Sequence, residues 1–308
     1  METIPSQKKQ FIDNMLDEEK QLRHAELADL SNLYPAEIDY LSSVWSKTET
    51  NRRRKIISLF IELAEENFEL NFDAIFKMCL KDPDEEVRVK AIEGLWENEE
   101  TILITPLINM LNEDNSEAVQ AAAARGLGKY AMLAEIKKLG SYSSGRVSQA
   151  LLTILNDKSK PKEVWRRALE AASPLSSVPE IKKYIEDAYK SSDLRMKDSA
   201  IYAMGRSCNS SWLPDIYKEM NSPSANSRYE AAAACGEICD DEAVPYLIKL
   251  TQDKDVDVQQ AAILSLGKIG GNKAKLHLQK CLKSEDDVIS EAAEQALKLL
   301  EADDPFGI

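Results

Sequence analysis

Residues 255–270 read Asp-Val-Asp-Val-Gln-Gln-Ala-Ala-Ile-Leu-Ser-Leu-Gly-Lys-Ile-Gly, and their pattern of apolar and small residues decides the fold. Val258, Ala262 and Leu266 are four residues apart, which places them on one stripe of an α-helix. The same frame starts at eight anchor residues: Arg53, Val87, Val119, Val164, Met196, Ser227, Val258 and Ile289. The intervals between them are 34, 32, 45, 32, 31, 31 and 31 residues, and a fixed period of this length is the signature of a repeat protein.

A second apolar segment precedes most anchor helices, and an acidic turn separates the two. Residues 102–111 and 244–250 are such segments, and residues 81–84 and 253–255 are such turns. Asp and Asn in the turns can cap the helix that follows. Small residues seven positions after the anchor leave room for a neighbouring helix, and they are Gly94, Gly126, Ala171, Ala203, Ala234 and Ala296. The sequence therefore predicts an all-α protein of about eight helix–turn–helix repeats.

The repeat resembles the HEAT-like repeat, in particular the short bacterial form that also occurs in phycobilin lyase subunits. The resemblance rests on residues 255–270 and on Asp84-Glu-Glu-Val-Arg-Val-Lys-Ala91, and it covers roughly residues 35–302. It implies a right-handed superhelical α-solenoid whose anchor helices line the concave side. It implies little about function, because such repeats serve many roles.

The two ends and one long interval complete the predicted organisation. The anchor helix around Ile56–Leu63 is apolar nearly all round, so we expect residues 1–34 to form a helical cap over it. The interval of 45 residues implies an insertion near 131–144, interpreted as a third short helix with a flexible turn that interrupts the superhelix. Residues 303–308 are predicted to be a C-terminal tail.

Composition narrows the classes of function. The chain has 308 residues and a formal net charge of −14, which argues against a partner that is nucleic acid or an anionic membrane. No stretch approaches 18 apolar residues and the N-terminus lacks a secretory pattern, so we expect neither a membrane span nor a signal peptide. Five scattered cysteines predict a reducing compartment, most simply the cytoplasm. Cys235 and Cys239, four apart on one predicted helix face, are expected to pack as small apolar residues.

Catalytic and metal motifs are missing from the sequence. Deoxyhypusine hydroxylase, another family built from this repeat, holds iron with His-Glu dyads, but here Ala25 follows His24 and Leu278 follows His277. No nucleophile motif, phosphate-binding loop or dinucleotide fingerprint is present. We therefore expect no catalytic residue, cofactor or metal.

A basic and aromatic cluster is the candidate binding site. Positions 3, 6 and 10 after each anchor form the predicted exposed ridge of the anchor helices. The middle of this ridge, with two adjacent residues, contains Arg125, Lys129, Trp165, Arg166, Arg167, Tyr202 and Arg206. Arg, Tyr and Trp are the usual anchors of protein interfaces. The alternative interpretation is that these arginines pair with carboxylates of neighbouring repeats as ordinary surface ion pairs.

These observations predict a non-catalytic protein-binding scaffold or adaptor whose concave groove receives a segment of a partner protein. Guanidinium groups favour a partner with acidic or phosphorylated residues beside an apolar one. The alternative, suggested by the resemblance, is a phycobilin lyase-type subunit that attaches a chromophore to a protein.

Overall fold

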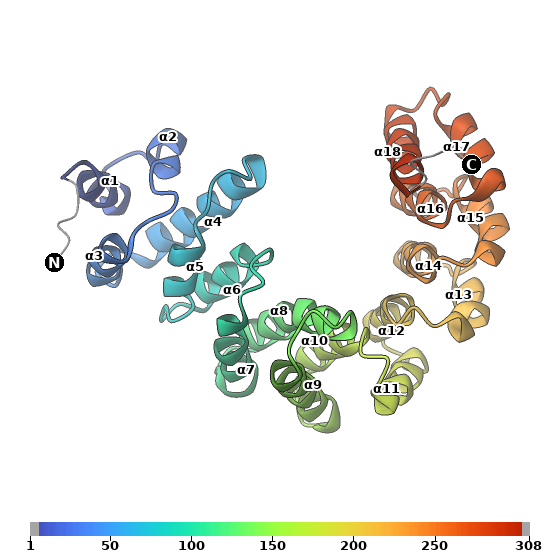
Figure 1. Ribbon diagram of the computed structural model, residues 1–308, viewed down its shortest axis with the longest axis horizontal. Coiled ribbons are helices and arrows are strands. Elements are labelled where there is room, and N and C mark those ends of the chain that lie inside the picture. Colours follow the sequence, from blue (N-terminus) through green and yellow to red (C-terminus); the bar gives the residue numbers. More distant parts are fainter. Residues whose placement is uncertain (1–5, 304–308) are drawn as a thin grey trace. The chain divides into compact units, whose positions relative to one another are not determined.

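Residues 6–303 of the computed structural model form helices joined by turns, with no β-strand among them (Figure 1). The prediction of an all-α repeat protein is confirmed. Within residues 6–303, two N-terminal helices precede eight helix pairs, as the repeat count predicted. Of the predicted tail 303–308, Asp303 ends the last helix and the other residues lie outside the described part of the chain.

The N-terminal half contains the helices α1 (Ser6–Leu16), α2 (His24–Ala28), α3 (Pro35–Trp45), α4 (Thr50–Glu66), α5 (Asp73–Cys79), α6 (Glu85–Gly94), η1 (Thr101–Leu103), α7 (Ile104–Glu113), α8 (Glu117–Glu135), α9 (Ser141–Asn156) and α10 (Lys162–Ala172). The C-terminal half contains α11 (Pro179–Tyr189), α12 (Leu194–Arg206), η2 (Ser210–Trp212), α13 (Leu213–Glu219), α14 (Ala225–Ile238), η3 (Asp241–Ala243), α15 (Val244–Leu250), α16 (Val256–Ile269), α17 (Gly271–Cys281) and α18 (Asp287–Asp303).

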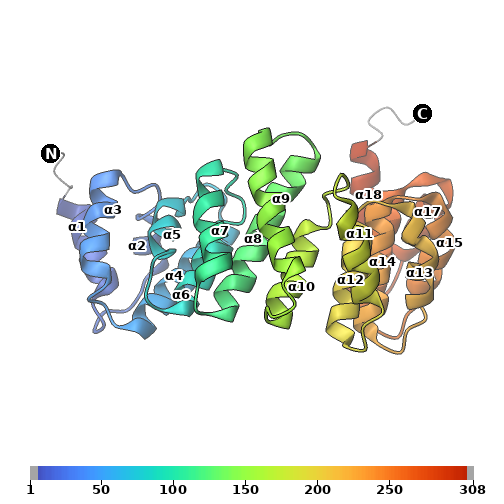
Figure 2. The ribbon, with the colours of Figure 1, turned by 90° about the horizontal axis from the view of Figure 1, so that it is seen from below.

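The chain divides into two compact units. The first comprises Met1–Tyr130 and Leu139–Ala168, and the second comprises Ala131–Lys138 and Leu169–Ile308. In the second unit α12, α14, α16 and α18 stack side by side, and α11, α13, α15 and α17 form the other layer (Figures 1 and 2). Each pair thus contributes one helix to each of two layers, which is the arrangement expected of stacked helical repeats.

Helices α1 and α2 pack against α4 in the first unit. Ile56, Ile57 and Phe60 of α4 are fully buried, and Leu27 of α2 is also buried. The Nε of Arg52 donates to the carbonyl oxygen of Met15 at 2.9 Å, which ties α4 to the end of α1. Helices α1 and α2 therefore lie against part of the surface of α4.

The region predicted to hold a third short helix does not form one. Helix α8 continues to Glu135, and α9 begins at Ser141, so the additional residues lengthen the second helix of one pair and the first helix of the next. The continuation is stabilised by burial, since Ala131 and Leu133 extend the apolar stripe of α8 into the interior. The intervening turn contains Lys137 in the left-handed region at φ 60°.

Successive helices of the second unit approach closely at glycines. A Cβ on Gly205 would lie 2.6 Å from the Cα of Ala234, and one on Gly267 would lie 2.8 Å from the Cα of Ala296. Ala234 and Ala296 belong to the set of small residues predicted from the sequence. Their partners are glycines nine positions after the anchor, a second small-residue position in the repeat that the sequence analysis did not identify.

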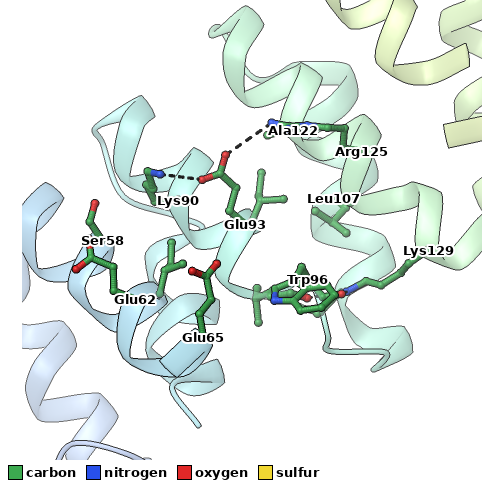
Figure 3. A pocket seen from close by; sticks show the side chains of 15 residues that line it. Ser58, Glu62, Glu65, Lys90, Glu93, Trp96, Leu107, Ala122, Arg125 and Lys129 are labelled. Atoms are coloured by element: carbon green, nitrogen blue, oxygen red, sulfur yellow. Dashed lines mark hydrogen bonds and ion pairs between the residues drawn. The ribbon is translucent and has the colours of Figure 1, made fainter. Parts of the chain in front are cut away.

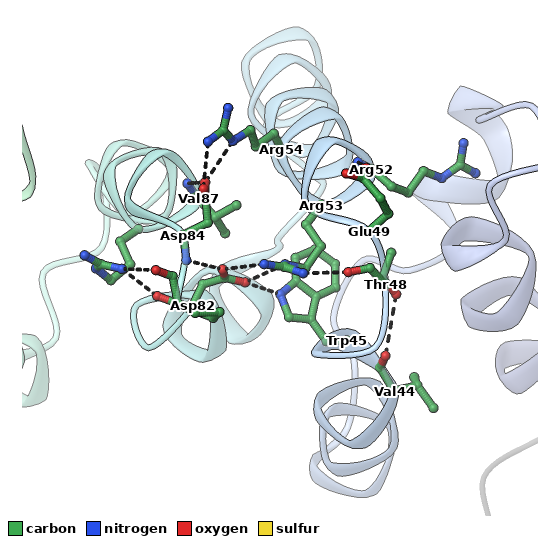
Figure 4. Close-up of polar contacts among 12 residues, drawn as sticks. Val44, Trp45, Thr48, Glu49, Arg52, Arg53, Arg54, Asp82, Asp84 and Val87 are labelled. Carbon is green, nitrogen blue, oxygen red and sulfur yellow. Dashed lines mark hydrogen bonds and ion pairs between the residues drawn. The ribbon is translucent and has the colours of Figure 1, made fainter.

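The acidic turns do more than cap helices. The Oδ1 of Asp84 accepts a bond from the backbone N–H of Val87 at 3.2 Å, as expected of an N-cap (Figure 4). Asp82 is buried, and its carboxylate accepts from the Nε and Nη2 of Arg53 at 3.0 and 3.1 Å and from the indole N–H of Trp45 at 2.6 Å. The turn between α5 and α6 is thus fastened to both helices of the preceding pair.

The same connection recurs along the chain. The guanidinium of Arg88 on α6 holds the carboxylate of Asp114 at 2.9 and 2.8 Å, and that of Arg228 on α14 holds Asp253 at 2.7 and 2.7 Å. In each case an arginine on the second helix of one pair reaches the turn within the next pair. Bidentate pairs of this kind fix geometry as well as contributing energy.

Candidate functional site

A pocket of about 630 Å³ lies within the first unit, between α4, α6, η1, α7 and α8 (Figure 3). Fifteen residues line it: Ser58, Ile61, Glu62, Glu65, Lys90, Ile92, Glu93, Leu95, Trp96, Leu103, Leu107, Ala122, Arg125, Gly126 and Lys129. The structure places five residues of the predicted ridge in its wall, and they are Lys90, Glu93, Ala122, Arg125 and Lys129.

The floor of the pocket is apolar and has an exposed tryptophan at its edge. Leu95, Leu103 and Leu107 are almost completely buried beneath it. A Cβ on Gly126 would lie 3.3 Å from Ile92 and 3.4 Å from Leu107, so glycine lets α8 pack tightly against this floor. Trp96 follows the end of α6 and is 65% exposed, which leaves most of its indole surface available to a ligand.

Lys129 forms part of the structural frame of this pocket. Its ammonium group donates to the carbonyl oxygens of Leu95 and Trp96 at 2.6 and 3.2 Å, and to that of Asn98. These carbonyls lie at and just beyond the C-terminal end of α6, where a cation compensates unpaired acceptors. Burial lowers the pKa of Lys129 to about 8, despite the neighbouring carboxylates of Asp73 and Glu99.

The charges above the floor are only loosely paired. The carboxylate of Glu93 lies 3.1 Å from the Nζ of Lys90 and 3.7 Å from the Nη2 of Arg125, whose side chain is 49% exposed (Figure 3). A separation of 3.7 Å is beyond hydrogen-bonding range, so Glu93 leaves the donors of Arg125 available. Arg125 therefore presents a guanidinium group at the mouth of the pocket.

Three of the predicted binding residues are on α10 and have partners nearby. The guanidinium groups of Arg166 and Arg167 lie 2.7 and 2.9 Å from Glu163, one turn earlier in the helix. Burial acts to raise the pKa of Glu163, but its two arginine partners outweigh burial and the net pKa is lowered. The indole N–H of Trp165 donates to the carbonyl oxygen of Leu155 at 3.0 Å. Arg166 and Arg167 are thus paired within their own helix, whereas the alternative interpretation expected carboxylates of neighbouring repeats.

The last two predicted residues, Tyr202 and Arg206, are on α12 in the second unit. The Nη1 of Arg206 lies 2.8 Å from Glu237, which also pairs with Lys268 at 2.6 Å. Tyr202 is 40% exposed, and burial of the remainder raises the pKa of its hydroxyl. Arg206 thus belongs to an ion-pair chain that joins α12, α14 and α16, while Tyr202 keeps an exposed face.

Trp96, Glu62 and Glu65 contribute to the pocket and were not predicted. Trp96 falls nine residues after its anchor, outside the ridge positions, although a large aromatic residue directly after a helix was a visible signal. Glu62 and Glu65 are on the apolar anchor helix α4, which the sequence indicated only as a buried helix.

The cysteines differ in part from the prediction. Cys79 and Cys235 are buried, as expected of small apolar residues. Cys239 is exposed, because α14 ends at Ile238 and Cys239 is its left-handed C-cap at φ 55°. The two therefore do not share a helix face. In residues 6–303 no group of three or more His, Cys, Asp or Glu side chains is arranged to hold a metal ion.

Among the described residues, none of the helices combines the length and the apolar character that a membrane span requires.

Comparison with known proteins identifies the repeat. The profile of the family described as HEAT repeats matches residues 72–146 and 213–298, slightly more than half of the chain. No curated protein matches the chain.

Several solved structures are similar to this chain. Yeast importin-β (Kap95p) is 15% identical, with a TM-score of 0.52 over 96% of this chain and 46% of that chain. The complex of CpcE and CpcF of phycocyanin lyase from Nostoc is 17% identical, with a TM-score of 0.48 over 75% and 94%. Human deoxyhypusine hydroxylase is 16% identical, with a TM-score of 0.38 over 87% and 96%. At these identities the likeness concerns the fold alone. The matched repeats, together with the helix pairs and their period, show that the chain belongs to the HEAT-repeat family.

Proposed function

We propose that this protein is a non-catalytic scaffold or adaptor that binds a segment of a partner protein, and that the pocket between α4, α6 and α8 is one place where it does so. The observation that carries the proposal is the exposed indole of Trp96 at the edge of an apolar floor, with Arg125 nearby. Trp and Arg dominate the binding energy of protein interfaces, most of all beside a pocket that excludes water. Stacked repeats present surfaces of this kind to their partners.

A partner with an acidic or phosphorylated residue beside an apolar one remains the proposed ligand. The guanidinium of Arg125 is half exposed and only loosely paired, so it can donate to a carboxylate or phosphate without losing an existing hydrogen bond. Three other arginines would first have to release the carboxylate that they hold at 2.7 to 2.9 Å before they could bind a ligand, and they are Arg166, Arg167 and Arg206. Exchange of a partly exposed ion pair costs little, so these residues stay in the proposal as secondary contacts.

The second candidate, a phycobilin lyase-type subunit, is favoured by the same indole and apolar floor, which also suit a planar chromophore. Arg125 at the mouth of the pocket distinguishes the two candidate functions, because a scaffold would use this residue to recognise a peptide. A chromophore that occupies the floor makes its main contact with Trp96.

The test is affinity purification from the cells that express the chain, followed by quantitative mass spectrometry. Wild-type bait is compared with Trp96→Ala and Arg125→Glu baits, and with Phe68→Ala and Lys55→Glu as controls. Phe68 is 92% exposed and Lys55 is exposed on α4, and neither lines the pocket. We expect a protein partner that both control baits retain and both pocket variants lose.

A partner set that is identical for all five baits would refute the proposed use of this pocket. Loss with Trp96→Ala alone, accompanied by visible absorbance in the purified wild-type material, would favour the chromophore-handling subunit.

A further inference from the structure

The walls of the pocket carry opposite charges. Glu62 and Glu65 project from α4 on one side, and Arg125 projects from α8 on the other (Figure 3). Glu93 and Lys90 of α6 lie between them and pair with one another at 3.1 Å. The pocket is therefore acidic towards α4 and basic towards α8.

The acidic wall is not compensated within the described chain. Glu62 and Glu65 are both exposed, and neither carboxylate makes a hydrogen bond or ion pair with another residue in 6–303. The nearby arginines of α4 are already engaged, since Arg53 holds Asp82 and Arg54 holds Asp84. Two uncompensated carboxylates beside an apolar floor favour a ligand that brings its own cation.

The basic wall depends on Arg125. The ammonium group of Lys129 is committed to the carbonyl oxygens at the end of α6, and Lys90 lies against Glu93. The guanidinium of Arg125 retains its donors, as described above. An anionic group that enters from this side meets a fork of N–H donors suited to carboxylate or phosphate.

The apolar floor lies between the two walls. Trp96 and the leucines beneath it offer a place for one or two apolar side chains, which fits a pocket of about 630 Å³. A ligand that is acidic throughout would place a second anion against Glu62 and Glu65, and a ligand that is basic throughout would place a cation against Arg125. Both mismatches are penalised, because like charges brought together cost free energy.

We propose that this pocket selects a peptide segment in which an apolar side chain stands between a basic residue and an acidic or phosphorylated one, and that this order of charges fixes the direction in which the segment crosses from α4 to α8. The inference rests on the proposed function, because it assumes that a protein segment occupies the pocket. It adds the basic residue and the direction.

The experiment is a selection of random linear peptides displayed on phage against the full-length chain. Selected peptides are synthesised, and their affinities are measured by the fluorescence of Trp96, with Trp96→Phe to assign the signal. The key variant is Glu62→Lys/Glu65→Lys. Its control is Glu66→Lys/Glu69→Lys, which makes the same change of net charge with exposed residues of the same region that do not line the pocket. Circular dichroism verifies that each variant is folded.

We expect wild-type protein and the control to select the same order of basic, apolar and acidic residues. The Glu62→Lys/Glu65→Lys variant should bind those peptides about tenfold more weakly and should select acidic residues where wild type selects basic ones. The apolar position should not change.

Peptides that require Trp96 but show no preference for a basic residue, or the same preference in the Glu62→Lys/Glu65→Lys variant, would overturn this inference and leave the proposed function standing. A selection that yields no peptide dependent on Trp96 would overturn both for this pocket.

Discussion

Substitution of Asp82 by Ala should be among the most destabilising changes in the first unit. The carboxylate accepts two bonds from Arg53, one from Trp45 and one from the backbone N–H of Asp84 at 2.8 Å. Its loss leaves Arg53, a residue that is 4% exposed, with only the bond from its guanidinium group to the carbonyl oxygen of Thr48. Breaking a buried ion pair from one side costs about 3–5 kcal/mol. An orphaned indole N–H adds about 1 kcal/mol or more, so we expect a loss near the upper end of that range.

The assay is urea unfolding followed by tryptophan fluorescence in a Trp212→Phe background. The three remaining tryptophans, Trp45, Trp96 and Trp165, all belong to the first unit, so the signal reports that unit alone. Arg53→Met completes a double-mutant cycle with Asp82→Ala. We expect the double variant to lose less stability than the sum of the single changes, because no charge is then left buried alone.

The control is the more exposed ion pair of Lys77 and Glu100, where Lys77→Ala should cost at most about 1 kcal/mol. If Asp82→Ala costs no more than this control, or if the cycle shows additive losses, then the buried network does not stabilise the unit in the way described.

Three further predictions concern pH, glycine packing and the N-terminal helices. Burial lowers the pKa of Lys129 from 10.5 to about 8, so between these pH values the unfolded chain binds more protons than the folded chain and the free energy of unfolding should rise with pH. The measurement is urea unfolding at several pH values, and the same pH dependence for wild type and Lys129→Met would contradict this prediction. Gly205→Ala should destabilise the protein by about 1–3 kcal/mol, because the added Cβ would clash with the backbone of α14. Gly145→Ala, at a helical position with open space around it, should stabilise the protein by about 0.5–1 kcal/mol, and thermal melts of both variants measure the difference. Deletion of residues 1–34 should expose the apolar surface of α4 and cause aggregation, and a truncated chain that stays monomeric by light scattering with an unchanged Tm would show that these helices are dispensable.

The repeat was predictable because its signal is local. Val258, Ala262 and Leu266 form one stripe within a single helix, and the next copy of the stripe follows 31 residues later. The length of α8 was not predictable in this way. It continues past residue 131 because Leu133 finds a buried site, and burial depends on tertiary packing rather than on local pattern.

The end of α14 illustrates a signal that was present but indirect. Cys208, Cys239 and Gly270 are 31 residues apart, and all three adopt positive φ at the end of a helix. Only Gly270 indicates a residue with positive φ from its type alone, because glycine adopts positive φ without a steric penalty. Because Cys208 and Cys239 occupy the equivalent position in earlier repeats, the period would have predicted a positive φ for them as well.

The candidate site was predictable in one wall only. Arg125 follows from the ridge positions of α8, and the pairing of Arg166 and Arg167 with Glu163 follows from helical spacing of three and four residues. The acidic wall was not predictable, because Glu62 and Arg125 line a pocket that is assembled from helices of three different pairs.

The arginine-to-turn connections make the repeats directional as building blocks. Arg88 and Arg228 each belong to one repeat but are neutralised by the turn of the following one. A single repeat moved into a designed array therefore brings an arginine that needs an aspartate in the following repeat. It also brings an aspartate in its own turn that needs an arginine in the preceding repeat. Arrays that are shortened or joined so that each of these arginines still has its aspartate in the next repeat should fold. A junction that separates the two residues buries a charge without its counterion.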